Sequence, residues 1–203
     1  MKLYELFERC LAAEYRQVAN AADFAIEREG NTLYLFFQKS VGAEDWGNNL
    51  DFPAKPYARM GDAVWFAHRG FLRVWKSAEE VLAPAIAEKS VKRMIPVGYS
   101  HGAALAVLCH EYIRFHRPEV SLAGYGFGCP RVVWGPLPRE VKARWRNFTV
   151  VRNIDDVVTH LPPSALGYRH VGRLLEIGRK GTYSDLDAHR AENILKELKK
   201  GGY

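Results

Sequence analysis

The feature that most constrains the fold is a pentapeptide, GYSHG at 98–102, which lies between two apolar segments of different periodicity. Residues 93–97, RMIPV, form an apolar run typical of a buried strand. Residues 103–113, AALAVLCHEYI, predict a helix that begins with small side chains. Each glycine stands two residues from the serine, where a Cβ would collide with neighbouring backbone in a sharp turn from strand to helix. The segment therefore predicts a strained turn that lifts the Ser100 hydroxyl above the edge of a sheet.

The rest of the chain alternates predicted strands with predicted helices. Short β-branched, aromatic or apolar runs predict strands at 32–38, 63–67, 93–98, 122–128, 147–152 and 174–178. Helical periodicity predicts helices at 3–19, 71–88, 101–115 and 186–200. This alternation is typical of an α/β fold with a mostly parallel central sheet and helices on both faces. A length of 203 residues suits one domain, so we expect a single α/β domain over residues 1–203.

Composition argues against several other classes of protein. The formal net charge is +6, but the basic residues are spread along the chain without an aromatic-basic motif. This favours a solvated basic surface over nucleic-acid binding and leaves transient contact with a lipid surface open. No stretch approaches the roughly 18 apolar residues that span a bilayer, so no transmembrane segment is expected. The sequence also lacks the His-Glu-x-x-His, Cys-x-x-Cys and Walker-type motifs, so we expect neither a metal nor an organic cofactor.

Two features bear on location. Charged residues interrupt the apolar ones throughout the first twenty positions, whereas a signal peptide needs an unbroken apolar core. The three cysteines, an odd number, are too few and too scattered for a disulfide framework. The sequence therefore predicts a cytoplasmic protein, with export by a non-classical route left open.

The turn predicts a nucleophilic role for Ser100, against the alternative of a Gly-Ser turn without chemistry. A serine hydroxyl is a weak nucleophile at neutral pH and needs a general base, which a third group must orient. In folds with this strand–turn–helix connection the chain order is Ser, then Asp or Glu, then His. The base and its partner are therefore expected after residue 100, which excludes His68.

Several segments, beside the pentapeptide, together resemble the class 3 lipases, the family of the fungal triacylglycerol lipases. They are YLFFQKSVGAEDWGNNLDF (34–52), WFAHRGFL (65–72), GYSHGAALAVL (98–108), YGFGCPRV (125–132), RNIDDVVTHLPP (152–163), YRHVG (168–172) and DAHRAENIL (187–195). The chain resembles a small, bacterial-type member. The resemblance implies the α/β-hydrolase fold and serine-dependent hydrolysis of lipid or short-chain acyl esters through an acyl-enzyme intermediate.

The resemblance also implies the two partners of the serine. The family carries its catalytic aspartate in N-x-x-D-x-V-x-x-L-P-P, which falls on Asp156, with Asp155 as the neighbouring alternative. Its terminal segment carries the catalytic histidine, which falls on His189. His160 and His170 are the rival bases, and their surroundings in the sequence favour packing roles for both.

An oxyanion hole needs two backbone N–H groups directed at the carbonyl oxygen as it gains charge. The motif assigns one to His101, the residue after the nucleophile. The resemblance assigns the other to Ser40, although the family has Arg-Gly before this Ser or Thr where this chain has Gln-Lys. Residues 42–49 correspond to the family's lid and are short and polar, which predicts little interfacial activation and a preference for soluble or short-chain esters.

Two alternatives to a simple esterase or lipase remain at this stage. One is a phospholipase A1 or galactolipase that acts on membrane lipid with the help of the basic surface. The other is a lipid- or protein-binding module that keeps the fold without turnover, for which the altered sequence before Ser40 is the reason.

Overall fold

The computed structural model describes residues 1–18, 22–38, 53–57 and 62–203. Its central sheet has eight strands, seven of them in the order β1-β2-β3-β6-β8-β10-β12, and β7 pairs with β6. The first three strands pair antiparallel, and from β3 onward every pairing in this sheet is parallel. The strands are β1 (Arg16–Val18), β2 (Ala22–Glu29), β3 (Thr32–Gln38), β6 (Arg93–Tyr99), β7 (Ser121–Leu122), β8 (Gly124–Phe127), β10 (Phe148–Asn153) and β12 (Arg173–Ile177).

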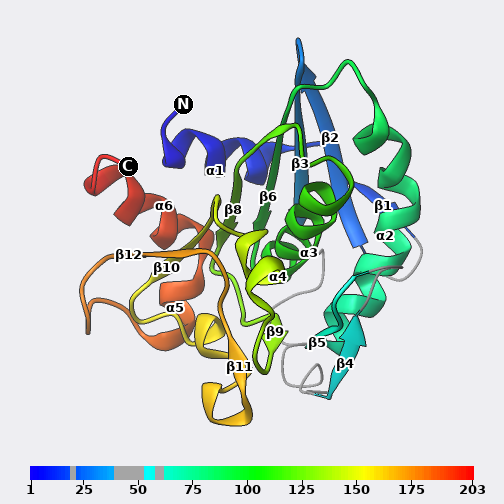
Figure 1. Cartoon of the computed structure of the whole chain (residues 1–203). Coiled ribbons are helices and arrows are strands. Elements are labelled where there is room, and N and C mark those ends of the chain that lie inside the picture. The colour runs from blue at the N-terminus through cyan, green and yellow to red at the C-terminus, as the bar shows by residue number, and fades with distance from the viewer. Residues whose placement is uncertain (19–21, 39–52, 58–61) are drawn as a thin grey trace.

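Helices cover both faces of this sheet (Figure 1). One buried cluster joins the sheet to α2 (Arg69–Ala87) and α3 (His101–His116), and the other joins it to α1 (Leu3–Ala12) and α6 (Ala191–Lys200). Strand β3 shows why the sheet is covered twice, since Leu33, Leu35 and Phe37 belong to the first cluster and Tyr34 and Phe36 to the second. Side chains alternate across a strand, so a run without polar residues has to bury both of its faces.

A second, four-stranded antiparallel sheet has the order β11-β9-β5-β4, and we call it the accessory sheet. Figure 1 shows it in the lower half of the view, the half that also holds α5 (Asp185–His189). Its strands are β4 (Ala54–Tyr57), β5 (Trp65–His68), β9 (Val133–Trp134) and β11 (Tyr168–Arg169). The remaining elements are the short helix α4 (Arg139–Ala143) and the 3₁₀ turns η2 (Val157–His160) and η3 (Ser164–Leu166).

The expected mostly parallel sheet with helices on both faces is therefore present, and several local predictions are wrong. The helix expected at 3–19 ends at Ala12, and two unpredicted strands, β1 and β2, follow. Strand β2 could not be predicted from its periodicity because Glu27 and Glu29 give it a polar face, where both carboxylates pair with Arg9 of α1. The strand expected at 63–67 is β5, which belongs to the accessory sheet rather than the central one. That residues 1–203 form a single domain stays a prediction.

The helix expected at 186–200 is two helices. Arg190, with φ −60° and ψ 137°, ends α5 and precedes α6. No helix in the described parts of the chain is both long enough and apolar enough to cross a bilayer.

Candidate active site

The turn between β6 and α3 has the strained geometry that the pentapeptide predicts. Ser100 has φ 56° and ψ −124°, and among the described residues it alone has a positive φ without being glycine. Its N–H donates to the carbonyl of Phe127 in the neighbouring strand β8, at 2.9 Å, which holds the turn against the sheet. Such a conformation costs of order 1–3 kcal/mol and persists only where the surroundings enforce it.

The glycines on either side of the turn have no room for a side chain. A Cβ on Gly98 would lie 2.2 Å from the carbonyl oxygen of Gly102, and one on Gly102 would lie 2.0 Å from the carbonyl oxygen of Phe37. Both obstacles are backbone atoms of packed elements, so they cannot move aside as a flexible side chain would.

We therefore expect Gly102→Ala to destabilise the fold by about 3 kcal/mol, because the added Cβ must separate α3 from β3. The measurement is the free energy of unfolding in urea. Gly201→Ala is the matched control, since a Cβ there meets at close range only the side chain of the terminal Tyr203. Equal stability of Gly102→Ala and the wild type would contradict the close approach of α3 to β3.

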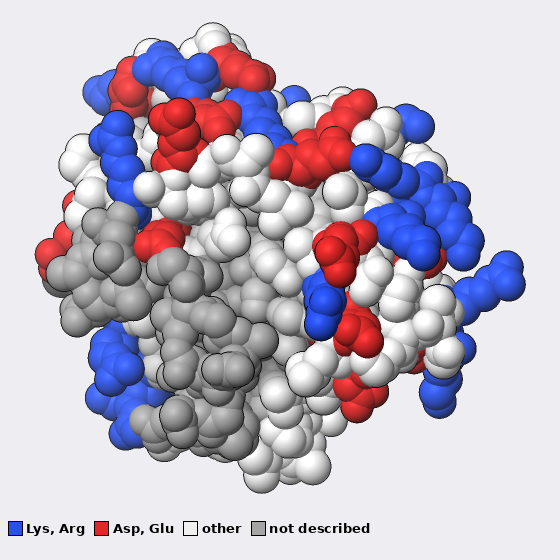
Figure 2. Space-filling view, turned by 180° about the vertical axis from the view of Figure 1, so that it is seen from behind, with Lys and Arg blue, Asp and Glu red and all other residues white. Residues whose placement is uncertain are grey.

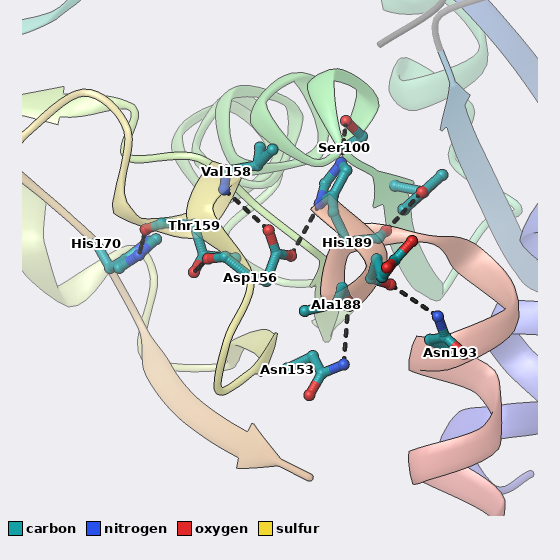
Figure 3. Close-up of polar contacts among 11 residues, drawn as sticks. Ser100, Asn153, Asp156, Val158, Thr159, His170, Ala188, His189 and Asn193 are labelled. Carbon is teal, nitrogen blue, oxygen red and sulfur yellow. Dashed lines mark hydrogen bonds and ion pairs between the residues drawn. The ribbon is translucent and has the colours of Figure 1, made fainter. Parts of the chain in front are cut away.

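Three side chains form a continuous line at this turn (Figure 3). Ser100 Oγ lies 2.8 Å from His189 Nε2, and His189 Nδ1 lies 2.8 Å from Asp156 Oδ2. When Nδ1 carries the proton, it donates to the carboxylate and Nε2 accepts from the serine hydroxyl. The structure thus brings together Ser100, Asp156 and His189 from three separate parts of the chain, at hydrogen-bond distance.

The carboxylate of Asp156 is fully buried and is fixed through both oxygens. Oδ2 faces His189, and Oδ1 accepts the N–H of Val158 at 2.9 Å, so Asp156 caps the 3₁₀ turn η2. Gly128, with φ 56°, provides the space beside the pair, since a Cβ there would lie 2.9 Å from His189 Cε1. A carboxylate held in this way can orient the imidazole toward Ser100.

The rival residues have other partners. Asp155 accepts the N–H groups of Gly181, Thr182 and Tyr183, and these bonds lower the pKa of this exposed carboxylate. His170 lies next to the carbonyl of Thr159, with Nε2 at 2.8 Å, and burial lowers its pKa to about 4. Burial and neighbouring arginines also lower the pKa of His160. None of these contacts reaches Ser100.

Of the two residues expected to form the oxyanion hole, His101 and Ser40, the structure describes only His101. His101 is the first residue of α3, and its ring packs edge-to-face on Phe71 at a centroid distance of 5.2 Å. Its N–H belongs to the first turn of a 16-residue helix, where N–H groups lack partners within the helix and the helix dipole favours negative charge. Ser40 and the expected lid at 42–49 lie outside the described residues.

Sequence reasoning missed two side chains beside the base. Tyr99 donates a hydrogen bond to the carbonyl of His189, and Asn153 donates one to the carbonyl of Ala188. Asn153 could have been found, because it opens the motif that contains Asp156, whereas Tyr99 occupies the variable position of the pentapeptide and gives no signal. In the described parts of the chain no cluster of three His, Cys, Asp or Glu side chains is placed to hold a metal ion.

Comparison with known proteins identifies the family. The family model for lipase (class 3) matches residues 34–166, about two thirds of the chain. The chain belongs to the class 3 lipase family. The matched range contains Ser100 and Asp156 and ends before His189, and the match confirms the predicted family.

Two curated lipases and one solved structure illustrate the relationship. The Rhizomucor miehei lipase is 26% identical over 70% of this chain and 40% of its own length. A Fusarium solani secreted mono- and diacylglycerol lipase is 29% identical over 72% of this chain and 44% of its own. A triacylglycerol lipase, described as having a serine protease triad, superposes with a TM-score of 0.69 at 22% identity, over 85% of this chain and 70% of its own. This last likeness confirms the α/β-hydrolase fold, and the chain spans less than half the length of the two curated lipases.

The relatives also correct the expected location. The Fusarium solani lipase and a Malassezia globosa relative are both named as secreted, which points outside the cell, so the prediction of a cytoplasmic protein is wrong. That prediction used the mixture of charged and apolar residues near position 1. The structure explains the mixture as the amphipathic helix α1, which buries Leu6, Phe7 and Cys10 against the sheet. The pattern therefore reports on packing and not on location.

Proposed function

We propose that this chain hydrolyses carboxylic esters through an acyl-enzyme intermediate on Ser100, with His189 as general base and Asp156 as its orienting partner. The observation that carries the proposal is the unbroken line of two 2.8 Å contacts from Ser100 Oγ through the imidazole to the buried Asp156 carboxylate. A serine placed in this way has the base and the orienting group that its nucleophilicity requires. An inactive binding module would have no use for such an arrangement.

The geometry supports a two-stage reaction. As Ser100 Oγ forms its bond to the ester carbonyl carbon, His189 Nε2 takes the hydroxyl proton, and the carbonyl oxygen becomes an oxyanion. The imidazolium, stabilised by Asp156, then gives that proton to the departing alkoxide, which leaves as the alcohol. Water attacks the acyl-enzyme in the second stage by the same proton transfers, releasing the acid and restoring Ser100.

Two backbone N–H groups are proposed to bind the oxyanion, those of His101 and Ser40. The position of His101 directly after the nucleophile, at the positive end of α3, supports its assignment. Ser40 is assigned by the resemblance of its segment alone. Each donor of this kind contributes about 3 kcal/mol to the stability of the transition state.

The proposed substrates are lipid or small acyl esters, reached by transient contact with a lipid surface. Exposed apolar side chains of the accessory sheet and its neighbouring turns support such contact: Val64, Trp134 and Leu166 are 53%, 36% and 52% exposed. The Trp134 indole is fixed in this surface, since its N–H donates to the Leu166 carbonyl at 2.8 Å. Exposed apolar groups of this kind lower the free energy of a protein at a membrane interface.

The charge distribution gives no comparable support for nucleic acid as a partner. On the face shown in Figure 2, basic and acidic side chains are interspersed over the upper part, and the basic side chains at the right edge are not continued across the face. A nucleic-acid surface concentrates Lys and Arg along the path of the phosphates.

The test is hydrolysis of p-nitrophenyl acetate, butyrate, octanoate and palmitate by the wild-type chain. We expect turnover of all soluble members, highest for the short acyl chains, because residues 42–49 are short and polar. The rate should change smoothly through the solubility limit of the octanoate ester. A steep rise in rate at that limit would contradict the expected weak interfacial activation, and no turnover of any ester would contradict the proposed function.

A further inference from the structure

The peptide group of His189 lies at a break between two helices. Arg190 is the C-cap of α5 and the N-cap of α6, so His189 is the last residue of α5 and Ala191 is the first of α6. The last carbonyls of a helix and the first N–H groups of the next lack partners within their own helices. A break of this kind leaves the base on a short helix of five residues, whose end other groups have to fix.

Three side chains from three different elements bind successive carbonyls at this helix end. Asn193 Nδ2 donates to the carbonyl of Asp187 at 2.8 Å, Asn153 Nδ2 donates to that of Ala188 at 3.0 Å, and the Tyr99 hydroxyl donates to that of His189 at 2.8 Å. Figure 3 shows Asn153 and Asn193 approaching the turn that carries His189.

Tyr99 makes the most contacts of the three with the base. Its hydroxyl donates to the His189 carbonyl at 2.8 Å, at the point where α5 ends. Its ring is stacked on the His189 imidazole, at a centroid distance of 5.4 Å and an interplanar angle of 24°. Burial raises the pKa of Tyr99, so the hydroxyl keeps the proton that it donates.

The Tyr99 ring also contacts the hydrophobic core. Phe7 of α1 packs against Tyr99 edge-to-face at 5.5 Å, so the ring lies between a fully buried core side chain and the imidazole. Tyr99 is adjacent in the chain to Ser100, whose backbone is fixed to β8. The tyrosine therefore connects the base to the strand end that presents the nucleophile.

We propose that Tyr99 is a positioning residue for His189: its hydroxyl fixes the peptide at the α5–α6 break, and its ring fixes the plane of the imidazole, between Ser100 and Asp156. This inference rests on the proposed function, since it assigns Tyr99 a role in the same site. Catalytic groups have to be held within about 0.5 Å of their productive geometry, and side chains behind them supply that precision.

Asn153 also helps to position His189, and it lies three residues before the catalytic carboxylate, Asp156. The Asn153 side chain is fully buried, and its amide Nδ2 donates to the carbonyl of Ala188, the residue before His189. The backbone carbonyl of Asn153 accepts the N–H of Asp156 at 2.9 Å. Gly178 leaves room for the amide, because a Cβ there would lie 2.5 Å from Asn153 Oδ1. The loop that carries Asp156 and the helix that carries the base are thus both bonded to one residue, Asn153.

The test is Tyr99→Phe, which keeps the ring and removes only the hydroxyl. We expect kcat for p-nitrophenyl butyrate to fall about 10-fold with KM unchanged within about twofold, because a displaced base slows proton transfer without altering substrate binding. Tyr183→Phe is the matched control: that hydroxyl also binds α6, through Glu197 at 3.0 Å, but does not contact His189. It should retain wild-type kcat.

A second measurement does not depend on turnover. In the wild-type protein, the proton on His189 Nδ1 is expected to give a downfield proton NMR signal because it is donated to a buried carboxylate. Tyr99→Phe should shift or broaden this signal, and Tyr183→Phe should not. If the wild type shows no hydrolysis while the signal changes only in Tyr99→Phe, the proposed function fails and the positioning role stands. Equal kcat and an identical signal in the wild type and Tyr99→Phe would overturn the positioning role.

Discussion

Ser100→Ala is expected to lower kcat/KM for p-nitrophenyl butyrate by roughly 10⁵-fold, because no other group can form the acyl-enzyme at this turn. The substitution removes the hydroxyl oxygen of Ser100, which lies 2.8 Å from His189 Nε2. Alanine and serine face the same backbone strain at a φ of 56°, so the variant should fold as the wild type does. The measurement is steady-state hydrolysis, with folding compared by circular dichroism.

Ser77→Ala is the matched control for that experiment. Ser77 lies on α2, where its hydroxyl donates to the Val74 carbonyl at 2.8 Å and plays no part in the site. This variant should keep wild-type activity. Turnover in Ser100→Ala at the level of the wild type would assign the reaction to another nucleophile.

Asp156→Asn is expected to lower kcat by about 10⁴-fold with little change in KM. The amide is similar in size, and its oxygen can still accept the N–H of Val158, so the loop should keep its shape. The amide carries no charge to stabilise the imidazolium, and its NH₂ group favours the tautomer of His189 that cannot accept the serine proton at Nε2. The measurement is the ratio of kcat values, with KM determined in the same assays.

The neighbouring carboxylate provides the control for this second variant. Asp155→Asn removes a charge one residue away, from a side chain whose bonds all go to the loop at 181–183. We expect it to keep kcat within about threefold of the wild type, with the loss confined to stability. A larger fall in kcat for Asp155→Asn than for Asp156→Asn would mean that the wrong carboxylate has been assigned.

Sequence alone predicts the parts of the site that depend on local sterics. The glycines of the pentapeptide mark the strained turn because any side chain at those positions would strike backbone, and this constraint can be read without a structure. The loop of Asp156 is recognisable through its resemblance to the family's N-x-x-D-x-V-x-x-L-P-P motif, and its residue types alone would fit a loop carboxylate without chemistry. The alternating strands and helices likewise predict the parallel sheet.

Features set by tertiary contacts could not be predicted in the same way. The helical periodicity of 186–200 continues through Arg190, and the break there depends on partners from β6 and β10 that supply Tyr99 and Asn153. The accessory sheet could not be predicted because β9 and β11 have only two residues each, too few for a periodic pattern. In both cases the decisive partners are distant in sequence.

The central claim is that Ser100 is a nucleophile activated by His189 and Asp156, and covalent labelling tests it most directly. The wild type, Ser100→Ala and Asp156→Asn are incubated with a fluorophosphonate, and the modified residue is located by mass spectrometry of the peptides. We predict one adduct on the wild type, at Ser100, no adduct on Ser100→Ala, and much slower labelling of Asp156→Asn. An unlabelled wild type, or an adduct on a residue other than Ser100, would contradict the account.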